Sequence, residues 1–529
     1  MDPSTTASSY EPLLQLATPE LYERNAFRLL ELPVQASERE LARRREVMER
    51  AAANRLPTPP GLSRVLPREP APDEHEVREA GHALLDAERR LAHEFFWFWP
   101  LQAEQARDDA ALARLAAGDA EAAAALWQQD GGAVARHNLA LLRHLQVLAL
   151  ERALAEDGAA TSASLLARAS RLWADVDAHW QAAAGDEALW DRLLARIRAI
   201  DDASLKTGAA RRLRQALPGA LALVRARTAL RALERGRTED AQRLARGLRG
   251  GEAEAPAIEE GLRRAIEPLR ALLKSLRETA ERAAEADEAS ADQAAEQLLD
   301  RAAAPLAGID LLLPESHPAR GAEHDLLAQR ALTCQVVFGN RTSRHARSLE
   351  LLDRIVGLAS SAGVKDRLAR ERRTVAENLE ASLCWTCGRN AADEPLAVPV
   401  PMYGDVRREA TSEGVRTAWR HLTIKVPRCR QCVEEDALFA RAGAWALGVF
   451  NLFLVAAIAS YAAFGQEMPV PALVLLAGLL AALVLLRRDR RRLGARCRPD
   501  VPRRRQADYP AIVEFKAKGW QYGEKPAEG

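Results

Sequence analysis

The sequence predicts a mainly α-helical protein with one small β-rich module and a pair of apolar helices near its C-terminal end. Three observations support this fold class. Ala, Leu, Arg and Glu dominate long stretches while aromatic residues make up 5% of the chain, a mixture that favours helices. Two Cys-x-x-Cys pairs flank alternating apolar residues, and two uncharged stretches follow them. The chain of 529 residues is too long for one compact core and should form several domains.

The charge balance argues against one broad class of function. Lys and Arg total 75 against 74 Asp and Glu, a formal net charge of +1, so the chain as a whole is not built to capture nucleic acid. A hydrophobic content of 48% excludes a disordered chain. Six cysteines are too few for a disulfide-stapled secreted protein, and residues 1–10 lack an apolar signal core. We expect no nucleic-acid partner, and a reducing cytoplasm around most of the chain.

Residues 15–105 are predicted to form a small helical unit. Ser37 followed by Glu40 is a capping-box pattern that begins its second helix. Residues 56–72 contain six prolines, so they form a loop. The aromatic run 95–99 should form the core of this unit or its contact with the following helices, because large rings gain most from burial. The three predicted helices cover residues 19–32, 41–53 and 73–99.

The runs AFRLLELPVQASERELARRREVMERA and, after the loop, EVREAGHALLDAERRLAHEFF resemble the first three helices of the J-domain of the DnaJ family over residues 26–96. The resemblance implies a DnaK-type chaperone as a partner, contacted through a basic second helix. That helix contains Arg39, Arg43, Arg44 and Arg45. Members of the family stimulate the partner through a His-Pro-Asp tripeptide, but here Ala71 precedes Pro72 and Asp73. We therefore expect stimulation to be lost. The alternative is an unrelated three-helix unit with an aromatic core.

Residues 106–382 are predicted to form a long helical array. Apolar residues recur at helical spacing around Gly118, and the segments 111–126 and 133–150 are similar to a tetratricopeptide-type helix hairpin. A clean repeat of this kind does not continue along the chain. Histidines in the array, such as His137, lack metal-ligand spacing and are expected to be structural. The other predicted helices cover residues 165–180, 188–200, 220–233, 238–248, 258–286, 290–304, 322–338, 343–358 and 364–382.

Residues 383–435 contain the candidate metal ligands, two Cys-x-x-Cys pairs whose thiolates would bind a tetrahedral Zn²⁺ from two sides. The ligands are Cys384, Cys387, Cys429 and Cys432. Residues 396–406 and 415–426 between the pairs are predicted strands, an arrangement similar to a zinc ribbon. The 41 intervening residues exceed the usual spacing, so an inserted hairpin must bring the pairs together. The alternative is a redox role for one pair, which would require a helix N-terminus inside a βαβ unit.

Residues 442–486 are predicted to form a transmembrane hairpin. Residues 442–464 and 468–486 carry no charge and are each long enough to cross a bilayer. A short connection, residues 465–467, joins them. The alternative, a buried helix pair in a soluble core, is disfavoured because both stretches are apolar on all sides.

The arginines beside these stretches predict the orientation. Arg441 precedes the first stretch, and five arginines follow the second within residues 487–492. Positive charge of this kind remains in the cytoplasm. We expect a multi-pass protein of a bacterial-type inner membrane with both termini cytoplasmic.

The tail, residues 487–529, is basic and then amphipathic. Its ten arginines between Arg487 and Arg505 are suited to anionic lipid head groups. Cys497 is interpreted as an ordinary thiol, with acylation as the alternative. Residues 510–518 predict a short helix ended by Gly519, which places Trp520 and Tyr522 at the membrane interface or against the cysteine module.

These features favour a membrane-anchored, non-enzymatic scaffold for protein partners, with zinc as a structural metal. The alternatives are a membrane co-chaperone of a DnaK-type chaperone and a thiol redox protein. The sequence contains no nucleophile elbow, P-loop, His-Glu-x-x-His motif or Gly-rich dinucleotide loop. We therefore predict no catalytic residues and no organic cofactor site.

Overall fold

A computed structural model shows a mostly helical chain that divides into two compact units. The first unit comprises Met1–Ala286, Gln293–Ala331 and Leu358–Ser361, and the second comprises Asp287–Asp292, Leu332–Gly357 and Ala362–Gly529. The residues that the structure describes are 10–54, 56, 59–102, 108–156, 163–205, 208–248, 254–411, 414–464, 470–494 and 504–526.

The N-terminal helices depart from the predicted pattern in two places. The predicted helix over residues 19–32 was wrong: only Ala26–Leu29 is helical, because Asn25 is extended and its side chain accepts the Phe27 N–H at 3.0 Å. The box of Ser37 and Glu40 is confirmed, because the Ser37 N–H donates to the Glu40 carboxylate at 2.8 Å. The predicted single helix over residues 73–99 was wrong: it is broken at Asp86, which takes an extended conformation and accepts the Arg89 N–H at 2.8 Å. The elements are α1 Glu11–Leu16, α2 Ala26–Leu29, α3 Glu38–Ala53, α4 Glu74–Leu85 and α5 Ala87–Phe95.

Several helices of the array are longer than the sequence pattern indicates. Prolines 218, 268 and 305 lie inside helices rather than ending them. The predicted break at Gly118 is confirmed, since this residue has φ +84° and separates α6 from α7. The helices are α6 Ala110–Ala116, α7 Ala120–Asp130, α8 Ala133–Glu156, α9 Ala163–Ala184, α10 Glu187–Ile200, α11 Ala209–Glu234, α12 Thr238–Arg246, α13 Ala255–Ala286, α14 Ala291–Leu312, α15 Pro318–Thr342, α16 His345–Val356 and α17 Ala362–Ser382.

The aromatic run forms the contact between the first helices and the array. The ring of Phe95 stacks on Trp190 with centroids 5.7 Å apart, and Phe98 stacks on Trp127 at the same distance. All five aromatic side chains of residues 95–99 are buried. Offset and edge-to-face ring pairs add to the gain from apolar burial. The sequence prediction for this run is confirmed.

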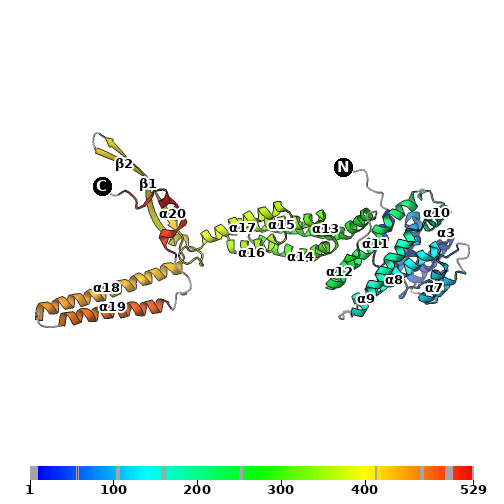
Figure 1. The fold of residues 1–529 in the computed structure, drawn as a ribbon, viewed down its shortest axis with the longest axis horizontal. Helices are drawn as coiled ribbons and strands as arrows, with labels where there is room; N and C mark the ends of the chain where they lie inside the picture. The colour runs from blue at the N-terminus through cyan, green and yellow to red at the C-terminus, as the bar shows by residue number, and fades with distance from the viewer. Residues whose placement is uncertain are drawn as a thin grey trace. The chain divides into compact units, whose positions relative to one another are not determined.

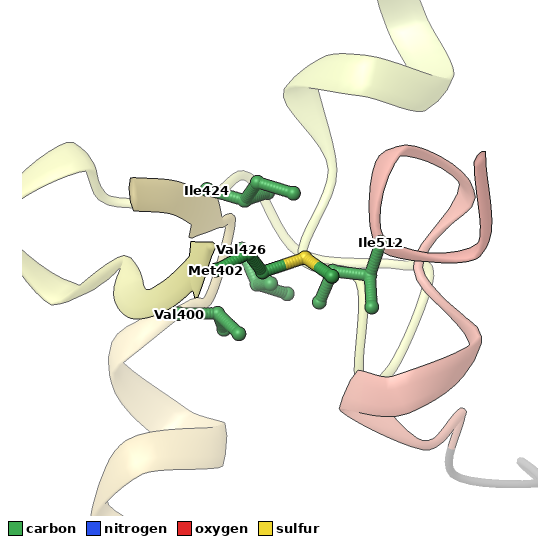
Figure 2. Close-up of a cluster of buried hydrophobic side chains, with 5 residues drawn as sticks. All are labelled: Val400, Met402, Ile424, Val426 and Ile512. Atoms are coloured by element: carbon green, nitrogen blue, oxygen red, sulfur yellow. The ribbon is translucent and has the colours of Figure 1, made fainter. Parts of the chain in front are cut away.

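The second unit contains a small antiparallel sheet. Strands β1 Val398–Thr411 and β2 Gly414–Val426 pair as predicted, and β3 Gln521–Tyr522 adds to the other edge of β1. Helix α20 Pro510–Ala517 places Ile512 against the sheet. Figure 2 shows this side chain meeting the strand residues. The buried cluster is Val400, Met402, Ile424, Val426 and Ile512.

Two apolar helices, α18 Arg430–Phe464 and α19 Val470–Gly494, pack side by side (Figure 1). A Cβ on Gly478 would lie 2.2 Å from the Cβ of Phe453, so this packing requires glycine. Among the described residues, Arg430–Ala456 is the one helical stretch long and apolar enough to cross a membrane, and Leu473–Leu485 is a shorter apolar stretch. The predicted connection 465–467 and Cys497 lie outside the described residues.

Candidate metal centre

The four predicted ligands converge at one point of the second unit. The sulfur atoms of Cys384, Cys387, Cys429 and Cys432 all lie within 4.8 Å of one another. None of these cysteines is in a disulfide, and the Sγ atoms of Cys387 and Cys429 are 3.9 Å apart. Four thiols at this separation match the donor set of a tetrahedral site. The described residues contain no other cluster of potential metal ligands.

A tight turn positions the first pair. The N–H of Cys384 donates to the Asn390 carbonyl at 2.8 Å, and the Gly388 N–H donates to the Cys384 carbonyl at 2.7 Å. Gly388 has φ +63°, a backbone conformation that glycine adopts without strain. The turn therefore directs both sulfur atoms to one side. A glycine directly after the second cysteine was a sequence signal for this turn that our interpretation did not use.

The second pair lies at the beginning of α18. Cys429 directly precedes the helix and Cys432 lies in its first turn. The Val433 N–H donates to the Cys429 carbonyl at 3.2 Å. The hairpin of β1 and β2 occupies most of the chain between the two pairs, which explains how the long spacing still closes the cluster.

Two hydrogen bonds connect the two cysteine pairs. The Trp385 N–H donates to the Pro427 carbonyl at 2.9 Å, and the Asn390 side chain donates to the Cys429 sulfur at 3.6 Å. Hydrogen bonds to ligand sulfur orient it and stabilise the thiolate.

The sulfur atoms influence one another electrostatically. Burial disfavours the Cys384 thiolate, but hydrogen bonds from the backbone of Cys387 and Cys429 outweigh it and lower the pKa of Cys384 to about 7. Burial and the neighbouring sulfur atoms raise the pKa of Cys432 well above its usual range. The first thiolate thus hinders formation of the next. A divalent cation reverses this effect because it binds all the thiolates together.

The C-terminal residues contact the same module, and the contacts of Arg504 and Arg505 are ones that sequence reasoning missed. The Trp385 indole N–H donates to the Arg505 carbonyl at 2.8 Å, and the Arg504 N–H donates to the Thr386 carbonyl at 3.2 Å. The Arg504 guanidinium also lies 4.9 Å from the centroid of the Trp385 ring.

Trp520 packs against Gly404, where a Cβ would lie 2.5 Å from the indole. Of the two predicted environments for Trp520, the cysteine module is the one observed.

The arrangement favours metal binding over the redox alternative. One pair does lie at a helix N-terminus, as a thiol redox site requires. The described strands of this unit, however, pair antiparallel, and no βαβ unit surrounds that pair. Thiolate ligands select soft or borderline cations, of which Zn²⁺ is the common structural choice. The histidines predicted to be structural lie elsewhere: His137, for example, bonds the Phe95 carbonyl at 2.8 Å.

Comparisons with protein families, with curated proteins and with solved structures found no match for this chain. What is established is a mostly helical chain with a four-cysteine cluster that is able to hold a metal ion.

Proposed function

We propose that the chain is a membrane-anchored, non-enzymatic scaffold whose α18 and α19 form a hairpin in the bilayer of a bacterial-type inner membrane. A zinc ion bound by the four cysteines stabilises the module next to this hairpin. The helices that precede the module remain in the cytoplasm and contact protein partners. The DnaJ-like resemblance of residues 26–96 makes a DnaK-type chaperone the first partner to test.

One observation carries the hairpin part of the proposal. Strands β1 and β2 precede the two apolar helices in the chain, whereas α20 and β3 follow them. The Ile512 side chain is fully buried against the strands, and Met402 pairs with Tyr522 in the sheet. Because these segments fold into one module, the chain must leave and re-enter on the same side of a membrane. An even number of crossings satisfies this requirement and a single crossing does not.

The surface of the two helices supports burial in lipid. Large apolar side chains on both are exposed, for example Trp445 at 75% and Leu452 at 69%. Patches of this kind in water are unfavourable, since apolar area gains about 25 cal/mol per Å² on burial. Further exposed apolar side chains of the pair are Leu447, Val455, Ile458, Leu473, Leu476, Leu480 and Val484.

Reporter fusions test this topology. A reporter that is active only in the cytoplasm is fused before Tyr10 and, separately, after Gly529, and we expect activity at both positions. The control is a deletion of residues 468–486, which leaves one apolar helix. In that variant the C-terminal reporter should lose activity. Opposite locations of the two ends in the complete chain, or an unchanged location after the deletion, would contradict the proposal.

Photo-crosslinking in native membranes tests the scaffold part. A photoreactive residue at Arg43, which is exposed on α3, should capture a discrete protein partner, and the same residue at Arg246 on α12 serves as the exposed control. Capture at position 43 alone identifies a partner of the J-like helices. Absence of any specific product at position 43 would remove the support for partner binding there.

A further inference from the structure

The apolar part of α18, residues 442–464, contains a single side-chain amide, that of Asn451. Asn451 lies ten residues beyond Arg441, which is about 15 Å along a helix that rises about 1.5 Å per residue. In a hairpin that crosses a bilayer, this position is close to the middle of a hydrocarbon core about 30 Å thick. A side chain as short as that of asparagine reaches neither the head groups nor water from that depth.

The Asn451 side chain lies on the side of α18 that faces away from α19. The contact with α19 involves Phe453, against which Gly478 packs, and Val449, Phe450 and Phe453 are half-buried, whereas Asn451 is exposed. At about 100° per residue, Asn451 is about 160° around the helix from Phe453. Among the described residues, the Asn451 amide has no hydrogen-bond partner. In lipid, an unpaired amide is costly because no water replaces the missing partner.

Three more exposed residues share this side of α18, and we call the four residues together the Asn451 face. The others are Ala444, Gly448 and Val455. Steps of four, three and four residues place all of them within about 60° of one another, a spacing typical of the contact line between two packed helices. A Cβ on Gly448 would meet no described atom within 4 Å, so the packing of α19 does not use this glycine. Alanine and glycine allow two helix backbones to approach closely in a bilayer.

A second copy of the chain fits the Asn451 face. A carboxamide both donates and accepts hydrogen bonds, so two identical side chains satisfy each other across a twofold axis. All copies insert in one orientation, because the arginines that flank the apolar stretches set it. The Asn451 of a second copy is therefore at the same depth in the bilayer. On the basis of the membrane location given under Proposed function, we propose that two chains form a dimer through the Asn451 face, with their α18 helices parallel and the two amides hydrogen-bonded to each other.

Energy transfer in lipid vesicles tests the proposal on the full chain. Two preparations carry a donor or an acceptor fluorophore on a peptide tag after Gly529, and they are mixed in vesicles of phosphatidylethanolamine and phosphatidylglycerol. Flotation of the chain with the vesicles and its resistance to extraction by alkali report membrane insertion separately. We expect energy transfer above that of randomly placed chains, and we expect it to fall as the lipid-to-protein ratio is raised.

Four substitutions locate the contact. Asn451→Leu removes the amide and should raise, by about tenfold, the protein density at which half of the chains are paired, whereas Asn451→Gln keeps an amide and should retain most of the pairing. Gly448→Ile prevents close approach of the two helices and should abolish the energy transfer. Gly443→Ile is the matched control and should leave it unchanged. A Cβ on Gly443 would also meet no described atom within 4 Å, but this residue is about 140° around the helix from Gly448.

The measurements separate failure of the dimer from failure of the membrane location. A chain that does not float with the vesicles, or that alkali releases, would overturn the membrane location and the dimer with it. An inserted chain that shows only random energy transfer would overturn the dimer alone. Energy transfer that persists unchanged in Asn451→Leu and Gly448→Ile, or that Gly443→Ile reduces equally, would also overturn the dimer and would indicate a contact elsewhere in the chain.

Discussion

The helices of the first unit and the module around the four cysteines are stabilised by different interactions. The first unit buries large rings, among them Phe95, Trp127 and Trp180. The module has a buried apolar cluster of five side chains, only one of which comes from outside its two long strands. Each such side chain gains about 1.5 to 3 kcal/mol, and each ordered residue loses about 1 to 2 kcal/mol in backbone entropy. Because this apolar cluster is small, we expect a cation bound by the four cysteines to contribute much of the stability of the module.

The largest effect should follow from removing a ligand of the metal. Cys429→Ser should release the bound cation and unfold the module, since structural Zn²⁺ contributes on the order of 10 kcal/mol to folding. Metal analysis should find about one zinc per chain in the unaltered protein and none in the variant. Cys334→Ser, at a buried cysteine of α15 outside the cluster, is the control and should retain zinc. Freshly purified protein without zinc would contradict this interpretation.

Acid should destabilise the first unit through its buried histidines. Burial lowers the pKa of His93 and of His137 to about 4 and that of His144 to about 3. In the unfolded chain these rings titrate near pH 6.5. Between pH 6.5 and pH 4 the unfolded state therefore binds more protons, so stability falls as pH falls through this window and is constant above it. Each ring contributes about 1.4 kcal/mol per pH unit there.

Chemical denaturation of the full chain at pH 7.5 and pH 5 measures this loss. His137→Gln should lower by one the number of protons that the chain takes up on unfolding, and so reduce the loss of stability between the two pH values. His75→Gln, at an exposed side chain of α4, should not change this loss. Equal pH dependence in both variants would mean that the buried ring does not control the acid sensitivity of the unit.

Truncating the central ring of the aromatic contact should have the next largest effect. Phe95 is fully buried and its ring contacts those of Phe96, Trp180 and Trp190. Phe95→Ala should lower the free energy of unfolding by about 3 to 5 kcal/mol, because it leaves a cavity. Leu85→Ala, at a side chain that is 60% exposed, should change it little. Zinc content should remain the same in both variants, and its loss in Phe95→Ala would show that the two regions do not fold independently.

Local signals were predictable from the sequence and long-range pairing was not. Ser37 with Glu40, and Gly118 at a helix break, act within a few residues, so their patterns were sufficient. The four cysteines were recognisable because their spacing itself reflects the geometry of a metal site. The cluster that Ile512 forms with the strands and the pairing of Tyr522 with Met402 join residues more than 80 positions apart. The sequence offered the cysteine module as one environment for Tyr522, but no local pattern gave these partners. The same is true of the Arg44 contacts, which join α3 to two separate loops.

The smallest effects concern the basic helix α3, where the structure changes which residues can test the resemblance to J-domains. Arg44 is 7% exposed, donates to the Leu30 and Pro59 carbonyls at 2.7 and 2.6 Å, and pairs with Glu31 at 2.9 Å. Arg44→Gln should therefore cost about 1.5 to 3 kcal/mol of stability. Arg43 is exposed, and Arg43→Gln should change stability by less than about 0.5 kcal/mol. Denaturant unfolding measures both values.

A partner test must therefore use Arg39 and Arg43, which are both exposed, and leave Arg44 in place. Without a His-Pro-Asp tripeptide, we expect the protein in nanodiscs to give no acceleration of a DnaK-type ATPase, even where salt-sensitive association is detected. The double variant Arg39→Gln with Arg43→Gln should weaken that association while the fold is retained. Clear ATPase stimulation that this double variant abolishes would favour the co-chaperone alternative over the scaffold. Stimulation lost only in Arg44→Gln would instead report unfolding of the helix, because Arg44 is a structural residue.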